Sequence, residues 1–335
     1  MQRLRGFLVL LAGAAGVACG AAGLACGDGG APHGAASAAV TADFVVSNRG
    51  GAWRVYELSS EGGARLVGSP RADGPAYEDR QPARLADGTT VFTSNRDGRD
   101  ALYLADRGAA SARPLFTASE ETQGVADSDP ASCGADRIVF ARAATAAGAA
   151  VDDADRDLYL AGRDGRGVRR LTRDPADDGA PCAMPDQRTI VFASTRLGTR
   201  RLFRLDSAAA DPEATVAPLL PPADASDDAP ACLPDGSVLF ARSLREGPSQ
   251  IFLVRFGEHG PVTRQITEAA TLPYGAGEPV AAAAGTLLLT AGPGPAKGGP
   301  RYAVYGISGG GYNLARVTRE RAGYEDWTRR LRPLR

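Results

Sequence analysis

Acidic residues that recur at one point of a repeated pattern are the first candidates for chemistry in this sequence. They belong to a short signature ending in proline, and an arginine follows most copies one strand later. Such acids and arginines can pair and fix the geometry of partly buried loops. Alternatively, acids gathered around one mouth of a central channel can bind a cationic partner or an ion. The copies are Asp79-Arg80-Gln81-Pro82, Asp127-Ser128-Asp129-Pro130, Asp178-Gly179-Ala180-Pro181, Asp227-Asp228-Ala229-Pro230 and Gly277-Glu278-Pro279, with Asp326 near the C-terminus.

The binding hypothesis takes one acid from each copy. The candidate binding residues are Asp79, Asp129, Asp178, Asp228, Glu278 and Asp326. The arginines that could neutralise the acids are Arg49, Arg96, Arg142, Arg196 and Arg242. A structure separates the two hypotheses, because the acids either point into an open funnel or are held by the arginines.

Residues for covalent or acid–base catalysis are poorly placed. The run Gly306-Ile307-Ser308-Gly309-Gly310 matches a nucleophile elbow, but it aligns with a strand-to-strand hairpin, whereas the elbow needs a strand, a sharp turn and a helix. His259 is predicted to lie in another such hairpin, so a histidine-based mechanism has one weak candidate. Asp153, Asp155 and Asp157 have calcium-loop spacing without the glycine and distant glutamate of an EF-hand. We expect no catalytic residue, no cofactor and no metal site.

Three cysteines fall near the same point of successive repeats, namely Cys133, Cys182 and Cys232. Free cysteine is among the most buried residue types, which favours buried thiols in neighbouring repeats. The alternative is a disulfide between two of these cysteines, which an oxidising compartment allows if their Cα atoms lie within about 7 Å. A zinc site is not predicted, since four suitable ligands are not at hand.

A repeat of about fifty residues positions all these side chains. Its best copy, residues 78–116, predicts a short strand at 83–85, an Asp87-Gly88 turn, an apolar strand around Phe92, a polar turn, a strand at 101–104 and a last strand at 115–116. Asp-Gly between apolar runs is a strong hairpin signal, because glycine tolerates the positive φ of the turn. Each copy is therefore predicted to be one four-stranded antiparallel blade.

Six copies align on an apolar residue of the second strand, 47 to 52 residues apart. The series is Val45, Phe92, Phe140, Phe192, Phe240 and Leu289. Third strands follow at 53–56, 101–104, 157–160, 201–204, 250–253 and 301–304, and fourth strands around Leu66, Leu115, Leu171, Leu219, Ile266 and Val317. The first copy lacks a first strand, and residues 324–331 at the C-terminus resemble the missing one. We therefore predict a six-bladed all-β propeller closed by the C-terminal strand joining the N-terminal blade, which would hide two sheet edges.

The N-terminal residues predict export. Residues 1–26 have the basic start and short apolar run of a secretory leader. Two runs resemble the lipobox of bacterial lipoproteins, which predicts lipidation at Cys19, with Cys26 as the alternative. The other alternative is a secreted protein without a lipid. Residues 27–41 form a flexible tether, and 42–335 form the propeller. The formal net charge of -1 gives no electrostatic reason to expect nucleic-acid binding.

The pattern of Asp-x-x-Pro, Asp-Gly, an apolar strand and an Arg-Leu-Thr-like strand resembles the WD40-like repeats of the TolB family. The resemblance is clearest at 177–196 and 227–242 and covers 42–335. It implies a non-catalytic module that binds a protein or peptide of the bacterial cell envelope at one mouth of the propeller. TolB has an α/β domain before its propeller, where this sequence has a leader and tether. We expect a monomer that meets the membrane only through a lipid anchor. The alternative is a carbohydrate- or peptide-active propeller enzyme with acids in its channel.

Overall fold

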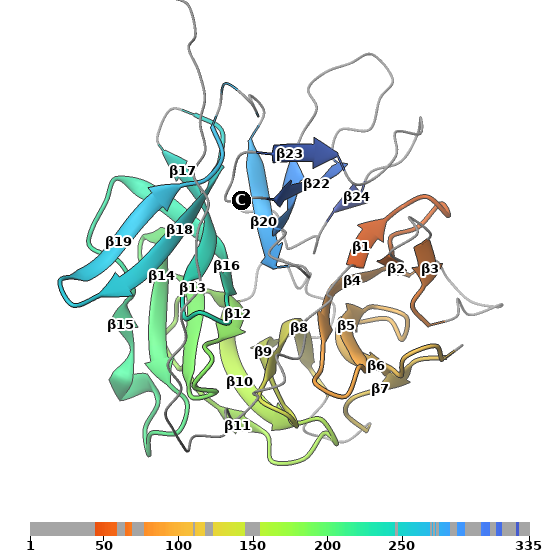
Figure 1. Ribbon diagram of the computed structural model, residues 1–335. Helices are drawn as coiled ribbons and strands as arrows, with labels where there is room; N and C mark the ends of the chain where they lie inside the picture. Colours follow the sequence, from red (N-terminus) through yellow and green to blue (C-terminus); the bar gives the residue numbers. More distant parts are fainter. Residues whose placement is uncertain are drawn as a thin grey trace, which may run out of the picture. The chain divides into compact units, whose positions relative to one another are not determined.

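The described part of the chain is built from four-stranded antiparallel sheets. The structure, a computed structural model, describes residues 44–58, 64–68, 77–109, 111–117, 123–144, 155–244, 247–268, 270, 272, 275–281, 287–291, 303–308, 313–316 and 326–327. In Figure 1 the colours run from orange at β1 to dark blue at the last strands, and the dark-blue β24 belongs to the same sheet as the orange β1. The prediction of an all-β propeller with four-stranded antiparallel blades is confirmed.

Strands that follow one another in the sequence are neighbours in the sheets, except that the C-terminal β24 joins β1, β2 and β3. In hydrogen-bonded order they are β24 (Asp326–Trp327), β1 (Phe44–Ser47), β2 (Arg54–Leu58), β3 (Ala64–Leu66); β4 (Asp79–Arg84), β5 (Thr90–Ser94), β6 (Ala101–Ala105), β7 (Arg113–Pro114); β8 (Val125–Cys133), β9 (Arg137–Ala144), β10 (Arg156–Gly162), β11 (Arg169–Arg170); β12 (Asp178–Ala183), β13 (Thr189–Leu197), β14 (Thr199–Asp206), β15 (Ala217–Pro218); β16 (Ala225–Cys232), β17 (Val238–Leu244), β18 (Gln250–Gly257), β19 (Gly260–Gln265); and β20 (Ala276–Ala281), β21 (Leu287–Ala291), β22 (Ala303–Ser308), β23 (Asn313–Arg316). One 3₁₀ turn, η3 (Glu213–Thr215), precedes β15.

Cross-strand aromatic pairs hold the middle of most blades. Phe92 lies opposite Tyr103 with ring centroids 6.2 Å apart, and both rings are buried. Such pairs add to the free energy of burial of each ring. The alignment positions of all six copies lie in second strands, as predicted, and their third-strand partners are Tyr56, Tyr103, Tyr159, Phe203, Phe252 and Tyr305.

Some strand positions differ from the prediction. The last third strand was expected at 301–304, but β22 begins at Ala303 and places Tyr305 opposite Leu289. Leu115 and Leu171 follow their short fourth strands instead of lying within them. Their N–H groups still donate to the third strand, Leu115 to the Leu102 carbonyl at 2.8 Å, so the ladder continues for one residue.

The proline signature lies inside the first strand of five blades, β4, β8, β12, β16 and β20, whereas the expected strand at 83–85 would place it ahead of the strand. There the register slips between the strand and its neighbour, as between Arg80 and Ala83 of β4. The residue before each proline has a left-handed backbone, with φ between 49° and 55°. These five bulge residues are Gln81, Asp129, Ala180, Ala229 and Glu278. Pre-proline residues normally prefer extended conformations, so the surrounding structure must hold this strain.

Contacts between successive bulges help to stabilise this strained backbone. The first strands β4, β8, β12, β16 and β20 contact one another in succession. The Gln81 side-chain oxygen accepts a bond of 3.1 Å from the Asp129 N–H in the next blade, and Asp129 Oδ2 accepts one of 3.0 Å from the Ala180 N–H. Ala180 packs against Ala229, the bulge residue of the following blade. Each bulge thus helps to position the one that follows.

A disulfide joins two neighbouring first strands. Cys182 of β12 and Cys232 of β16 are bonded, with Cα atoms 5.7 Å apart. The preference for three buried thiols is therefore wrong for these two cysteines, because adjacent first strands bring them within bonding distance. Cys133 is a buried free thiol, as favoured.

The C-terminal pairing and the N-terminal assignments are only partly described. β24 pairs with β1 over two residue pairs, Val46 with Trp327 and Ser47 with Asp326. The predicted leader (1–26), both lipidation candidates, Cys19 and Cys26, and the tether (27–41) lie outside the described residues. No helix among the residues described here is long and apolar enough to cross a bilayer.

Candidate functional site

The predicted acids lie at one end of the blades. At this end, which we call the entry end, first strands begin, second strands finish and third strands start. In β4 to β6 it contains Asp79, Ser94 and the turn that leads to Ala101. Because every blade has the same strand order, equivalent side chains of neighbouring blades lie at the same end.

In two blades the arginine is the direct cross-strand partner of the aspartate. Arg142 faces Asp127, and its Nε and Nη2 donate to Oδ1 and Oδ2 at 2.6 and 3.0 Å. Arg242 binds Asp227 in the same way at 2.6 and 2.9 Å. Both carboxylates are almost fully buried, so two parallel bonds replace their water. Burial raises the pKa of Asp127, although Arg142 opposes this effect.

In two other blades a serine occupies the cross-strand position, and the arginine lies two residues further along. Ser94 faces Asp79, and Arg96 reaches back to donate Nε to Ser94 Oγ at 3.0 Å and Nη2 to Asp79 Oδ1 at 2.9 Å. The β12–β15 blade repeats this at 3.1 and 2.8 Å through Ser194, Arg196 and Asp178. Burial raises the pKa of Asp178 to about 6, against the opposing effects of Ser194 and Arg196.

The same arginines cover the aromatic pairs. Arg142 Cζ lies 5.3 Å from the ring centroid of Phe140 and 5.2 Å from that of Tyr159. Cation–π attraction adds to the ion pair at such distances. The repeated unit is therefore a stack of carboxylate, guanidinium and two rings, and it recurs at Arg96, Arg196 and Arg242.

A second set of ion pairs runs from blade to blade. Arg156 donates Nη1 to Asp129 at 2.7 Å and Nε to Asp177 at 2.6 Å. Arg200 donates Nη1 to Asp177 at 2.7 Å and Nε to Asp228 at 2.9 Å. These five residues form an alternating chain of charge across three blades. Burial opposes ionisation, but the bonds from Arg156 and Arg200 hold the pKa of Asp177 well below its usual range.

The candidate binding acids thus divide into several environments. Asp79 and Asp178 bind the arginine of their own blade, whereas Asp129 and Asp228 belong to the chain between blades. Glu278 is buried and accepts a bond of 3.2 Å from Thr290. Asp326 pairs through its backbone with Ser47. Asp79 and Asp178 therefore make the acid–arginine pairs of the structural interpretation, whereas Asp129 and Asp228 pair with arginines outside the predicted pattern.

Sequence reasoning missed Arg156, Asp177 and Arg200. A signal was available, because Asp100, Arg156 and Arg200 all stand just before a predicted third strand. The alignment shows a recurring charged position there. It does not show which acid each side chain would reach, since the partners lie in different blades.

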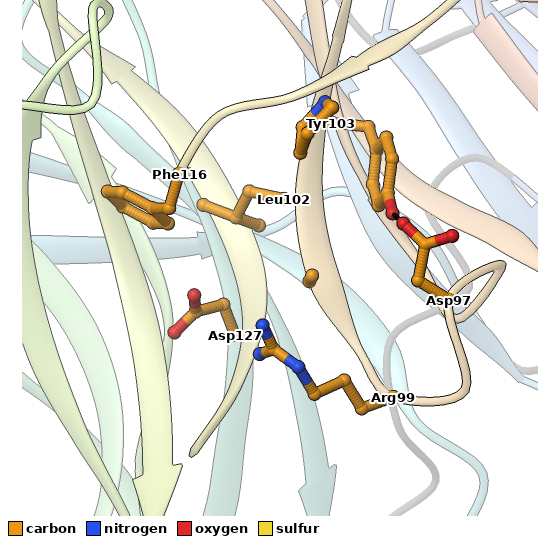
Figure 2. Close-up of a pocket in the computed structure, with 8 residues that line it drawn as sticks. Asp97, Arg99, Leu102, Tyr103, Phe116 and Asp127 are labelled. Carbon is orange, nitrogen blue, oxygen red and sulfur yellow. Dashed lines mark hydrogen bonds between the residues drawn. The ribbon is translucent and has the colours of Figure 1, made fainter. Parts of the chain in front are cut away.

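A cavity of about 300 Å³ lies between the β4–β7 and β8–β11 blades at the entry end. Leu102, Pro114 and Phe116 form much of its apolar wall. Figure 2 shows the Arg99 guanidinium directed toward Asp127 and the Tyr103 hydroxyl bonded to Asp97. The cavity therefore combines apolar surface with polar groups of both signs, a composition typical of ligand sites. Sequence analysis did not predict it.

The other catalytic candidates lie in structural positions. Ser308 ends β22 and pairs with Asn313 of β23, which agrees with the predicted hairpin. His259 is exposed in the β18–β19 hairpin, also as predicted. Asp157 accepts a bond of 2.5 Å from Arg170. Among the described residues, no group of three or more His, Cys, Asp or Glu side chains is arranged to hold a metal ion.

Comparison with known proteins agrees with this fold. No protein-family model matches the sequence. A Protein TolB homolog from Chlorobium luteolum is 28% identical over 165 residues, 48% of this chain and 33% of that protein. TolB from Acinetobacter baumannii matches with a TM-score of 0.62 and 16% identity, over 84% of this chain and 64% of that one. The fold is that of a TolB-like β-propeller. The predicted resemblance is confirmed, and the matches span a third to two thirds of these relatives' lengths.

The TolB-like propeller also resembles an enzyme. An oligogalacturonate lyase, solved in complex with manganese, matches with a TM-score of 0.54 and 14% identity, over 84% of this chain and 76% of that one. One architecture therefore occurs in TolB and in an enzyme alike, and function must be argued from the side chains.

Proposed function

We propose that this TolB-like propeller is a non-catalytic binding module of the bacterial cell envelope that engages a protein or peptide at its entry end. The observation that carries the proposal is the set of four buried ion pairs within blades, Asp79–Arg96, Asp127–Arg142, Asp178–Arg196 and Asp227–Arg242. A channel enzyme of the alternative class needs carboxylates that can exchange protons with a substrate. Here arginines already occupy these four.

Exposed apolar side chains support a protein partner at this end. Leu197 and Leu244 finish the second strands β13 and β17, and they are 65% and 58% exposed. Large exposed hydrophobic residues are a usual feature of protein contact sites. The entry end thus offers apolar contacts around a rigid ion-paired frame.

We further propose that residues 42–335 form one closed six-bladed propeller. In support, the described strands form six four-stranded sheets, and β24 both pairs with β1 and contacts β22 of the preceding blade. Closure would depend on the C-terminal strand, of which the described residues pair with β1 at Asp326 and Trp327. Removing residues 324–335 should then lower the Tm of the chain more than a deletion in an exposed hairpin does.

The exported location remains part of the proposal. Residues 1–26 would direct export, Cys19 or alternatively Cys26 would carry the lipid, and 27–41 would tether a monomeric propeller in the periplasm or on the outer membrane. Mass spectrometry of the chain purified from membranes tests this. Loss of the lipid mass in Cys19→Ser but not in Cys26→Ser assigns the site, and an unlipidated secreted chain would overturn it.

A pull-down from envelope extract with the full tagged chain tests the binding role. We expect a stoichiometric protein partner whose recovery falls at least tenfold in the double variant Leu197→Asp and Leu244→Asp. Val262→Asp is the matched control, because Val262 is 67% exposed on β19, near the hairpin at the opposite end of its blade.

Turnover of an oligosaccharide or peptide panel would favour the alternative, a carbohydrate- or peptide-active enzyme. The structural likeness to oligogalacturonate lyase is the reason to include acidic oligosaccharides in that panel. Activity that disappears in Asp129→Asn or Asp228→Asn variants, both still folded, would overturn the binding proposal.

A further inference from the structure

The cavity between the β4–β7 and β8–β11 blades has a stiff wall. The Phe116 ring lies 5.5 Å from the Phe140 ring, and Arg142 covers it at 5.1 Å. On the other side, the Tyr103 hydroxyl donates to the Asp97 carboxylate. These contacts fix both aromatic walls before a ligand arrives, which lowers the entropy cost of binding.

Arg99 is the cavity's unusual group. Its Nη1 donates to the Val125 carbonyl at 3.0 Å, and no carboxylate of the described residues lies within ion-pair distance of it. Asp127, toward which it points in Figure 2, already takes two bonds from Arg142. A half-buried guanidinium in a mainly apolar cavity is suited to bind an anion, and a carboxylate matches its planar donors.

The opposite rim presents an acceptor. Asp97 is exposed, and its carboxylate, which accepts a bond from the Tyr103 hydroxyl, is an acceptor that an N–H donor of a ligand can reach. The two rims therefore favour a ligand that carries a carboxylate at one end, an N–H donor near it and an apolar group between them. A terminal amino-acid residue of a peptide has all three, whereas a fatty acid lacks the donor.

We propose that this cavity binds the C-terminal residue of a partner peptide, with an apolar or aromatic side chain against Pro114 and Phe116 and the terminal carboxylate on Arg99. The size fits, because about 300 Å³ is the low end of small-ligand pockets and is enough for one large residue. Capture of a free C-terminus is an established mode of peptide recognition. The inference rests on the proposed binding function and specifies its ligand.

Fluorescence anisotropy with the full chain tests it, using a labelled peptide that ends in a free phenylalanine carboxylate. We expect saturable binding that weakens at least tenfold when the same peptide is amidated at its C-terminus, and by a similar factor when phenylalanine is replaced by lysine. Arg99→Gln should lose at least tenfold in affinity, since a charge-assisted bond is lost. Arg99→Lys should retain part of the affinity.

Arg255→Gln is the matched control, because Arg255 is exposed on β18 in another blade. Its affinity should equal that of the unmodified chain, and thermal melts should show that all variants fold. Equal affinity for free and amidated peptides, or binding of decanoate without binding of the peptide, would overturn the inference. No binding of any peptide, with a partner still recovered in the pull-down, would also overturn it and leave the binding function standing.

Discussion

Arg142 lies directly across the β8–β9 ladder from Asp127, with both carboxylate oxygens within 3.0 Å of guanidinium nitrogens and with the Phe140 ring beneath it. Their side chains are 9% and 2% exposed. The pair is thus a buried, bidentate contact, and its Asp127 also lines the cavity. Loss of the pair should affect both stability and the shape of the cavity.

Arg142→Met should lower the free energy of unfolding by about 3 to 5 kcal/mol, because it leaves the Asp127 carboxylate buried and unpaired. Arg173→Met is the control, since the Arg173–Asp211 pair is about half exposed and should contribute less than about 1 kcal/mol. Urea titration measures both. Equal effects would contradict a buried, structural role for the Arg142 pair.

Gly179→Ala should destabilise the chain of charges between blades by about 2 kcal/mol. A Cβ there would lie 2.5 Å from Arg156 Nη2, and this guanidinium is buried and held by Asp129 and Asp177. Gly277→Ala is the matched control, because Gly277 has the same place before its proline and its added Cβ meets nothing within 4 Å. Thermal unfolding that gives the two variants the same Tm would refute this account.

Reduction of the Cys182–Cys232 disulfide should cost about 4 kcal/mol of stability, as expected for a crosslink that closes a loop of this length. Dithiothreitol should therefore lower the Tm of the unmodified chain. The double variant Cys182→Ala and Cys232→Ala should start with the lower Tm and show no further response to the reductant. A response in that variant would place the redox effect elsewhere.

Asp178 should make stability fall as pH rises from about 4 to about 6. Its pKa is raised by burial from the usual 3.8 to about 6, so in this window the folded chain keeps a proton that the unfolded chain has lost. The contribution is on the order of 3 kcal/mol, fully lost above the folded pKa. The free energy of unfolding should be measured from pH 3 to 8 for the unmodified chain and for Asp178→Asn. The value for the unmodified chain minus that for the variant should fall by this amount as the pH rises from about 4 to about 6. A constant difference would contradict it.

The repeat predicted the blades because their signals are local. Phe92 and Tyr103 belong to apolar runs separated by a polar turn, and a hairpin needs only neighbouring residues to form. The Asp87-Gly88 turn is confirmed, with Gly88 at a φ of 86°. The acid and arginine types were also visible in the sequence, including the possibility that they pair.

Contacts between blades decided the rest. Pre-proline preferences argue against a left-handed Asp129, and bonds to Gln81 and Ala180 in other blades help to hold it in that conformation. The disulfide likewise depends on two first strands being neighbours, which a spacing of 50 residues does not reveal.

The sequence by itself therefore determined the blade, its strand order and the residue types at its entry end. Tertiary structure alone decided which acid each arginine neutralises and where a cavity remains. The physical reason is distance along the chain. Strand and turn preferences act within a few residues, whereas Arg156 and Arg200 reach partners 21 to 28 residues away. One partner of each, Asp177 for Arg156 and Asp228 for Arg200, belongs to the next blade and is brought close only when blades pack side by side.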